Sequence, residues 1–112
     1  MNIYVDGVAG TPVTQTGNLG TGAVYIGQCS CGSFNINGLI SNVQIYNTSL
    51  SSSEVLQLYL EGIGGAPIDP THIVGWWPLN GNAQDYSGNN NNGAVAGGVS
   101  YSSAWTSGYI AP

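Results

Sequence analysis

Apolar and polar residues alternate along the segment 43–46, VQIY, so that its two aliphatic side chains fall on one side and Gln and Tyr on the other. A period of two residues is typical of a strand with one face on a core. Shortly before it, Asn37-Gly38 has the composition of a tight turn whose two central residues take positive φ. The pattern therefore predicts a turn that leads into a half-buried strand.

A short helix is predicted soon after this strand. Ser51 and Glu54 have the spacing of a capping box, in which each side chain bonds the backbone amide of the other residue. From Val55 onwards, apolar residues fall at i, i+3 and i+4, so one or two helical turns would bury a single stripe. The glycines of the segment 62–65 are expected to end the helix.

Other short segments have the alternation or the β-branched content of strands. The segment 3–5 runs into Asp6-Gly7, a turn signal that predicts a hairpin with a return strand from Val8. A strand at 74–79 would place Trp76 and Trp77 on opposite faces. The remaining predicted strands are 23–26, Val95 and 99–101.

The composition changes between Gly62 and His72, where three glycines and two prolines fall within eleven residues. Such a stretch predicts a linker. We therefore divide the chain into residues 1–62, a Gly/Pro linker at 63–72, and residues 73–112.

Two groups of motifs resemble one known family. YVDG at 4–7, YIG at 25–27 and FNINGLISNVQIYNTSLSSSEVLQLY at 34–59 resemble the C-terminal half of a laminin G-like, concanavalin A-like lectin-glucanase domain. The chain has Ser41 and Asn42 where members of the family usually carry acidic residues. Beyond the linker, IVGWWPLNG at 73–81 and DYSGN at 85–89 resemble the N-terminal edge of the same domain. The resemblance implies an all-β fold, an antiparallel β-sandwich of the jelly-roll type with one short helix.

The order of the two parts is unusual, because the C-terminal half comes before the N-terminal edge. The chain could cross the junction of two tandem domains, or its parts could pair as a permuted, shortened sandwich. A third alternative is that subunits complete one another along a fibre by donating strands. An isolated excerpt would leave edge strands and a tryptophan exposed, so we favour the permuted or the assembled form.

Charge excludes several classes of partner. The chain has no Lys or Arg, a net charge of −5 and 4% charged residues, against roughly 25% in ordinary soluble domains. It has no cations to neutralise phosphates, so we expect no nucleic-acid binding. No apolar stretch approaches the length of a membrane span, so no membrane insertion is expected. The uncharged polar surface suits an extracellular or cell-surface location.

We expect no catalytic activity. Glycoside hydrolysis, the chemistry of the family's glucanases, needs two carboxyl groups about 5 to 9.5 Å apart. The five carboxylates of this chain fall in turns, at helix ends and in loops, without a strand that pairs them; they are Asp6, Glu54, Glu61, Asp69 and Asp85. The sequence also lacks a Ser/His/Asp arrangement.

A calcium site is one candidate for the loop that begins at Asp85. Side-chain oxygens are concentrated there, and Ca²⁺ takes six to eight oxygen ligands including carboxylate. The resemblance adds that related domains often hold calcium near this Asp. The candidate metal ligands are Asp85, Ser87, Asn89 and Asn91. The alternative is that these side chains cap turns.

Carbohydrate binding is a second candidate, because saccharides stack on exposed aromatic rings and bond to amide side chains. The candidate residues are Trp76, Trp77, Tyr86 and Asn89. Tryptophans on sandwich strands are more often part of a core, so we expect one of Trp76 and Trp77 to be buried.

Cys29 and Cys31 are separated by one residue. They could form a disulfide, bind a metal or remain free thiols. Two thiolates supply half of a tetrahedral metal site, and His72 is the only histidine in the sequence. We favour the disulfide for an acidic chain of extracellular character.

The interpretation that these patterns favour is a non-catalytic extracellular structural or cell-adhesion module, as a repeat of a surface protein or a subunit of a fibre. Its expected partners are other copies of itself or neighbouring domains of a longer surface protein. The alternative is a carbohydrate-binding, lectin-like module that recognises glycans, with calcium as a possible cofactor.

Overall fold

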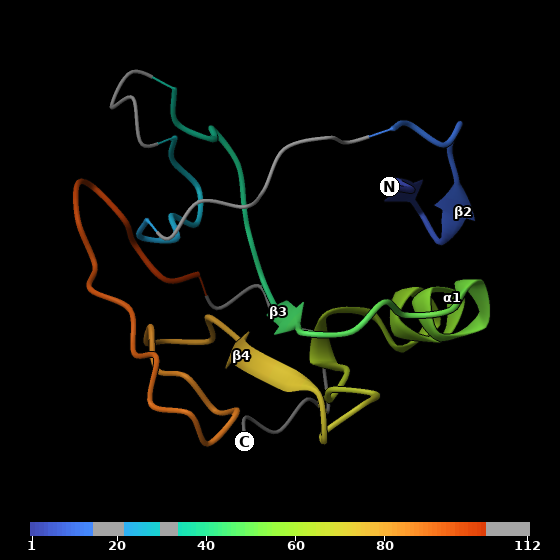
Figure 1. Cartoon of the computed structure of the whole chain (residues 1–112). Coiled ribbons are helices and arrows are strands. Elements are labelled where there is room, and N and C mark those ends of the chain that lie inside the picture. The colour runs from blue at the N-terminus through green and yellow to red at the C-terminus, as the bar shows by residue number, and fades with distance from the viewer. Residues whose placement is uncertain (15–21, 30–33, 103–112) are drawn as a thin grey trace.

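The computed structural model describes residues 1–14, 22–29 and 34–102. The regular structure in these ranges is four short strands, one α-helix and one 3₁₀ turn (Figure 1). In chain order the elements are β1 (Tyr4–Val5), β2 (Val8–Ala9), β3 (Val43–Tyr46), α1 (Ser52–Glu61), η1 (Gly62–Gly64) and β4 (Ile73–Trp77). The strands form two separate antiparallel sheets, β1–β2 and β3–β4. Two small antiparallel sheets with a single short helix agree with the all-β character expected from the sequence, and the jelly-roll sandwich stays a prediction.

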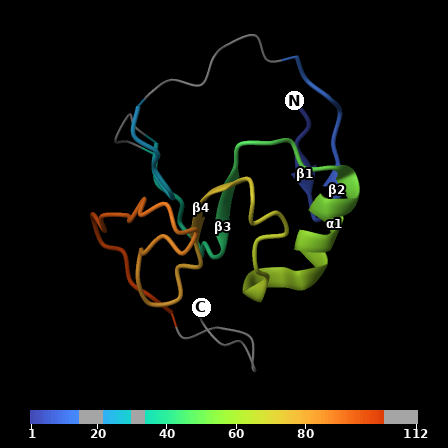
Figure 2. The ribbon, with the colours of Figure 1, turned by 60° about the horizontal axis from the view of Figure 1, so that its bottom comes forward.

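The predicted hairpin at the N-terminus is confirmed. Asp6 and Gly7 have φ values of 51° and 75°, the positive pair that a two-residue turn with the twist of its strands requires. The hairpin lies against α1 (Figure 2), where the Tyr4 hydroxyl is 2.9 Å from Ser52 Oγ. A side chain at Gly7 would come within 3.1 Å of the Leu56 and Tyr59 side chains, so close packing as well as conformation requires glycine there.

The predicted helix and its cap are also confirmed. The Glu54 amide donates to Ser51 Oγ over 3.3 Å, and the Ser51 amide donates to Glu54 Oε2 over 2.7 Å. These bonds satisfy two amides at the helix N-terminus and define the capping box. The bonds from the Ser51 side chain and amide hold the pKa of Glu54 below its ordinary value. Gly62, with φ of 71°, ends the helix.

The pairing of β3 with β4 joins the two sides of the predicted linker. The strand predicted at 43–46 has these bounds in the structure, and it lies antiparallel to β4 with Val43 opposite Trp77 and Ile45 opposite Gly75. The strand predicted at 74–79 instead ends at Trp77, because Pro78 follows and has no amide to continue the ladder. The register shifts at Ile45/Tyr46.

Several local predictions are wrong. Neither Asn37 nor Gly38 has positive φ, and the predicted strands at 23–26, Val95 and 99–101 are not formed. Gln28 and Asn35 form one isolated antiparallel bridge, and the residues beside them do not extend this bridge into a ladder. A strand is stable only when a neighbour accepts its backbone hydrogen bonds, and no backbone hydrogen bond between described residues involves these three segments.

The described part of the chain has a small core. Trp77, 7% exposed, is its buried hydrophobic residue, and Pro78 beside it is completely buried. A side chain at Gly75 would come within 2.1 Å of the Trp77 ring, so the indole lies directly over this glycine. Among the described residues, no helix has the length and apolar character that crossing a membrane requires.

Candidate functional site

The carboxylate of Asp85 is bonded by three backbone amides. The amides of Trp76 and Ser87 each donate to Oδ1 over 2.9 Å, and the amide of Asn91 donates to Oδ2 over 2.8 Å. The Asp85 amide in turn donates to Asn92 Oδ1 over 2.9 Å. The loop that follows β4 is therefore folded around this one side chain.

The same loop covers the outer edge of β4. The Tyr86 amide donates to the Trp76 carbonyl over 2.8 Å. The Val74 carbonyl accepts from Ser87 Oγ, Asn89 Nδ2 and Asn91 Nδ2, at 3.2, 3.1 and 2.8 Å. Side chains thus occupy carbonyls that would otherwise be offered to another strand, and this protects the edge.

Hydrogen bonding lowers the pKa of Asp85. Partial burial acts to raise this pKa, but the amides of Trp76, Ser87 and Asn91 and the Ser87 side chain outweigh burial and lower it to about 2. Backbone donors aimed at a carboxylate favour its ionised form. Asp85 is therefore negatively charged at neutral pH without a positively charged side chain beside it.

The four candidate metal ligands lie together in this loop, and each has a hydrogen-bonding role in it. Asp85 accepts amides, Ser87 Oγ donates to β4, and the amide groups of Asn89 and Asn91 donate to carbonyls of β4. Within the described ranges, no three His, Cys, Asp or Glu side chains gather. This arrangement matches the turn-capping alternative, and the calcium site stays a prediction.

A second polar cluster, the Asn42 cluster, lies on the other side of β4 and joins β3 to the predicted linker. Asn42 Oδ1 accepts from Trp76 Nε1 over 2.8 Å and from Gln44 Nε2 over 3.0 Å. Asn42 Nδ2 donates to the Gly65 carbonyl over 2.9 Å. The φ of Asn42 is 50°, a left-handed conformation that asparagine tolerates better than most residues.

Tyr46 extends the Asn42 cluster along the linker. Its hydroxyl donates to Gln44 Oε1 over 2.5 Å and accepts from the Ile68 amide over 3.2 Å. Burial raises the pKa of Tyr46 despite the lowering effect of the backbone bonds at Ile68 and Asp69. The residues between Gly65 and Ile68 are therefore held on the face of β3. Asn42 was not predicted as a site residue, although it stands where laminin G-like domains usually carry an acidic residue, and this difference was the available signal.

The candidate sugar-binding residues are divided between two faces. Trp77 is buried and its Nε1 donates to the Asn91 carbonyl over 2.9 Å, whereas Trp76 is half-buried, so the expectation of one buried tryptophan is confirmed. Trp76 meets Tyr86 edge to face, with ring centroids 6.2 Å apart. Asn89 is exposed, and its amide is bonded to β4. Trp76 and Tyr86 therefore form a pair that Trp77 does not join.

Asp69, Thr71 and His72 form a small exposed cluster at the end of the predicted linker. Asp69 Oδ1 accepts from Thr71 Oγ1 over 2.6 Å, and Asp69 Oδ2 is 2.6 Å from His72 Nδ1. The Thr71 hydroxyl is the main cause of the lowered pKa of Asp69, and the His72 ring contributes less. The cluster orders the turn that leads into β4.

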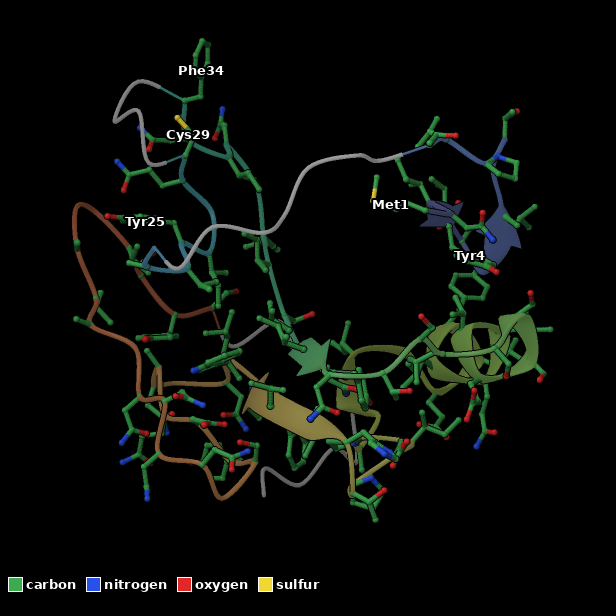
Figure 3. All side chains as sticks on the ribbon, viewed as in Figure 1. Met1, Tyr4, Tyr25, Cys29 and Phe34 are labelled. Carbon is green, nitrogen blue, oxygen red and sulfur yellow. The ribbon has the colours of Figure 1, made fainter. Side chains whose placement is uncertain are left out.

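Cys29 is disulfide-bonded, and Cys31 lies outside the described residues, so the pairing of Cys29 with Cys31 stays a prediction. Phe34, close to Cys29, points away from the rest of the chain (Figure 3).

An open groove of about 1640 Å³ is lined mainly by three segments outside the helices and strands, and we call it the apolar groove. One wall is formed by residues 24–28 and 35–41, and the other by residues 91–102; Ile45 and Trp77 also line it. Tyr25 extends from the first wall towards the side on which the second wall lies (Figure 3). None of the described residues that line the groove is charged.

No family model matches the chain, and searches of the curated proteins and of the solved structures likewise return no match. The resemblance to laminin G-like domains therefore depends on the sequence motifs.

Proposed function

We propose that the chain is a non-catalytic structural or adhesion module of an extracellular protein, related to the laminin G-like sandwiches and completed by packing against another protein surface. The observation that carries this proposal is the amount of apolar surface left outside the core. One hydrophobic residue of the described chain is buried, while nineteen large hydrophobic residues are exposed. Exposed apolar surface on this scale is typical of a protein that meets a partner. A partner surface would supply the second layer that a β-sandwich requires.

The roles of the carboxylates support a non-catalytic function. Glu54 caps α1, Asp69 orders a turn, and Asp85 holds the loop on β4. Each of these carboxylates stabilises local backbone structure. The disulfide of Cys29 is consistent with an oxidising, extracellular environment.

Carbohydrate binding is the second candidate, favoured by the Trp76–Tyr86 pair. Both rings are half-buried, and the Tyr86 hydroxyl lies beside the Asn82 and Gln84 amides at 3.1 and 3.3 Å. An aromatic ring next to amide groups suits a sugar. Here, however, Trp76 Nε1 is already bonded to Asn42, and the neighbouring Trp77 is buried.

One pair of fluorescence measurements separates these functions. We expect the dilute chain to bind the dye ANS strongly, because ANS reports exposed apolar surface. We also expect a panel of soluble glycans to leave tryptophan fluorescence unchanged. The matched control is the Tyr86→Phe variant, which keeps the ring pair and loses the hydroxyl. Weak ANS binding would contradict the packing module. A saturable change with a glycan, weakened in Tyr86→Phe, would establish the lectin-like function instead.

A further inference from the structure

The turn that leads into β4 contains the one Asp–Pro bond of the sequence, Asp69-Pro70. An X–Pro bond is a tertiary amide without an N–H group, and its nitrogen is protonated more readily than that of an ordinary peptide bond. An aspartate directly before proline can therefore attack the carbonyl of its own residue and expel the proline nitrogen in acid. The groups around Asp69 in this turn suit that reaction.

The Asp69 carboxylate is held in its ionised, nucleophilic form. Its Oδ1 accepts from the Thr71 amide over 3.1 Å and from Thr71 Oγ1 over 2.6 Å, and its Oδ2 is 2.6 Å from His72 Nδ1. The bond from the Thr71 hydroxyl is the largest cause of the lowered pKa of Asp69, and it outweighs desolvation with help from His72. The carboxylate therefore stays ionised in mildly acidic solution, where the proline nitrogen can take up a proton.

The bond that would break is polarised and open to solvent. The His72 amide donates to the Asp69 carbonyl over 3.3 Å, which places a donor on the oxygen where negative charge develops during attack. The Tyr46 hydroxyl on β3 bonds the backbone of Asp69 and helps to fix its position. Pro70 is exposed, so water can reach the bond.

His72 is the only side chain of the sequence that can become positively charged, because Lys and Arg are absent. Two other titratable groups interact with Asp69 by charge, Glu54 of α1 and Tyr46 of β3, and Asp69 acts to raise the pKa of both. A histidine gains its charge in mildly acidic solution and then favours the ionised form of a carboxylate beside it. Acidification therefore adds a positive charge at this turn next to the nucleophile.

We propose that the chain cleaves itself at the Asp69–Pro70 bond in mildly acidic solution. One oxygen of the Asp69 carboxylate attacks the main-chain carbonyl carbon of the same residue, and the bond from this carbon to the Pro70 nitrogen breaks. The nitrogen takes a proton from the solution and becomes the amine of a new N-terminus. Water then opens the cyclic anhydride left on Asp69, so the reaction consumes one water molecule and leaves a C-terminal aspartic acid.

Cleavage at this bond would leave the two parts of the chain paired. β3 lies before the bond and β4 after it, with Val43 opposite Trp77, and the Asn47 amide donates to the His72 carbonyl over 3.0 Å. We therefore expect the two fragments to remain together in the native state and to separate on unfolding. Each chain reacts once, so this activity goes beyond the proposed function and does not depend on it.

The test follows the two fragments by mass spectrometry under denaturing conditions, after incubation of the full chain at about pH 5 and at about pH 7.5. We expect cleavage at the lower pH, roughly 100-fold faster in the folded chain than in the chain unfolded by urea at that pH, because unfolding removes the geometry of the turn. The Asp69→Asn variant keeps a side chain of the same shape without the carboxylate, and it should remain intact over the same period.

Thr71→Val and Thr71→Ser are the matched variants, because serine keeps a hydroxyl for Asp69 Oδ1 and valine removes it. Thr71→Val should slow cleavage roughly 10-fold, the loss expected for one charge-assisted hydrogen bond. Its rate should also stop rising at a higher pH as the solution is acidified, since the pKa of Asp69 is no longer held as low. A merely structural role of Thr71 would not move this pH. Thr71→Ser should behave like the wild type.

Each result has a defined meaning. The helical circular dichroism of α1 verifies that each variant is folded at the pH of the test. An intact folded chain, or equal rates in the folded and the urea-unfolded chain, would overturn the proposal, because the bond would then have no more than the ordinary acid lability of Asp–Pro. Equal rates and pH profiles in Thr71→Val and Thr71→Ser would overturn the role of the hydroxyl. Binding of ANS, which tests the proposed function, is independent of all these results.

Discussion

Replacing Trp77 with alanine is expected to abolish the cooperative unfolding transition of the chain. Trp77 is the buried hydrophobic residue of the described core, its ring covers Gly75, and its Nε1 bonds the Asn91 carbonyl. Truncation of a buried tryptophan costs about 3–5 kcal/mol, which is comparable to the whole stability of a small domain. Urea titration followed by circular dichroism measures the change.

Trp76→Ala is the matched control for this variant. Trp76 is adjacent in sequence and carries the same ring, but it lies half-buried on the opposite face of the sheet. We expect a smaller loss, from its bond to Asn42 and its contact with Tyr86. A larger loss of stability in Trp76→Ala than in Trp77→Ala would mean that the core lies on the other face.

Asp85→Ala is expected to have the second largest effect, because it leaves three backbone amides without their acceptor. The loss of these charge-assisted hydrogen bonds should lower the free energy of unfolding by about 2–4 kcal/mol in total. This total is smaller than the sum of three separate bonds, because water can reach part of the loop and bond the amides instead. Asp85→Asn should cost less, because its Oδ1 can still accept from Trp76 and Ser87. Equal losses in the two variants would contradict the role of Oδ1.

The pH dependence of stability tests the same carboxylate. Because the folded-state pKa of Asp85 is lowered to about 2 from 3.8, its contribution is fully present above pH 4 and is lost as the pH falls towards 2. The contribution is about 1 kcal/mol once solvent screening is allowed for. Glu54 and Asp69 also have lowered pKa values, so the difference between wild type and Asp85→Asn isolates Asp85. The measurement is urea titration at a series of pH values; a difference that does not shrink on acidification would contradict the assignment.

Local chemistry explains which elements could be predicted from the sequence. The turn at Asp6-Gly7 and the capping box of Ser51 and Glu54 each depend on residues at most three positions apart, and both are present. The strand at 43–46 was also predictable, because its alternation matches a sheet with one buried face. The turn and the capping box need little help from the rest of the chain, whereas the strand is completed by β4.

The predictions that failed concern segments whose structure depends on distant partners. Residues 23–26 and 99–101 have strand-like composition, but composition does not supply the neighbour that a ladder needs. Asn42 was not identified as a site because its partners Gly65 and Trp76 lie 23 and 34 positions away. Asp85 was identified, but the sequence could not distinguish a cation from backbone amides as its partner.

The most direct test of the completed module is hydrogen–deuterium exchange of two segments at low and high chain concentration. Residues 43–46 pair with β4 in the single chain, so we expect protection of their amides at both concentrations. Residues 94–101 have no described backbone partner, so we expect fast exchange when the chain is dilute and protection when it is concentrated. Fast exchange of residues 94–101 at both concentrations would contradict completion of the core by a second copy. Fast exchange of residues 43–46 in the dilute chain would contradict the pairing of β3 with β4.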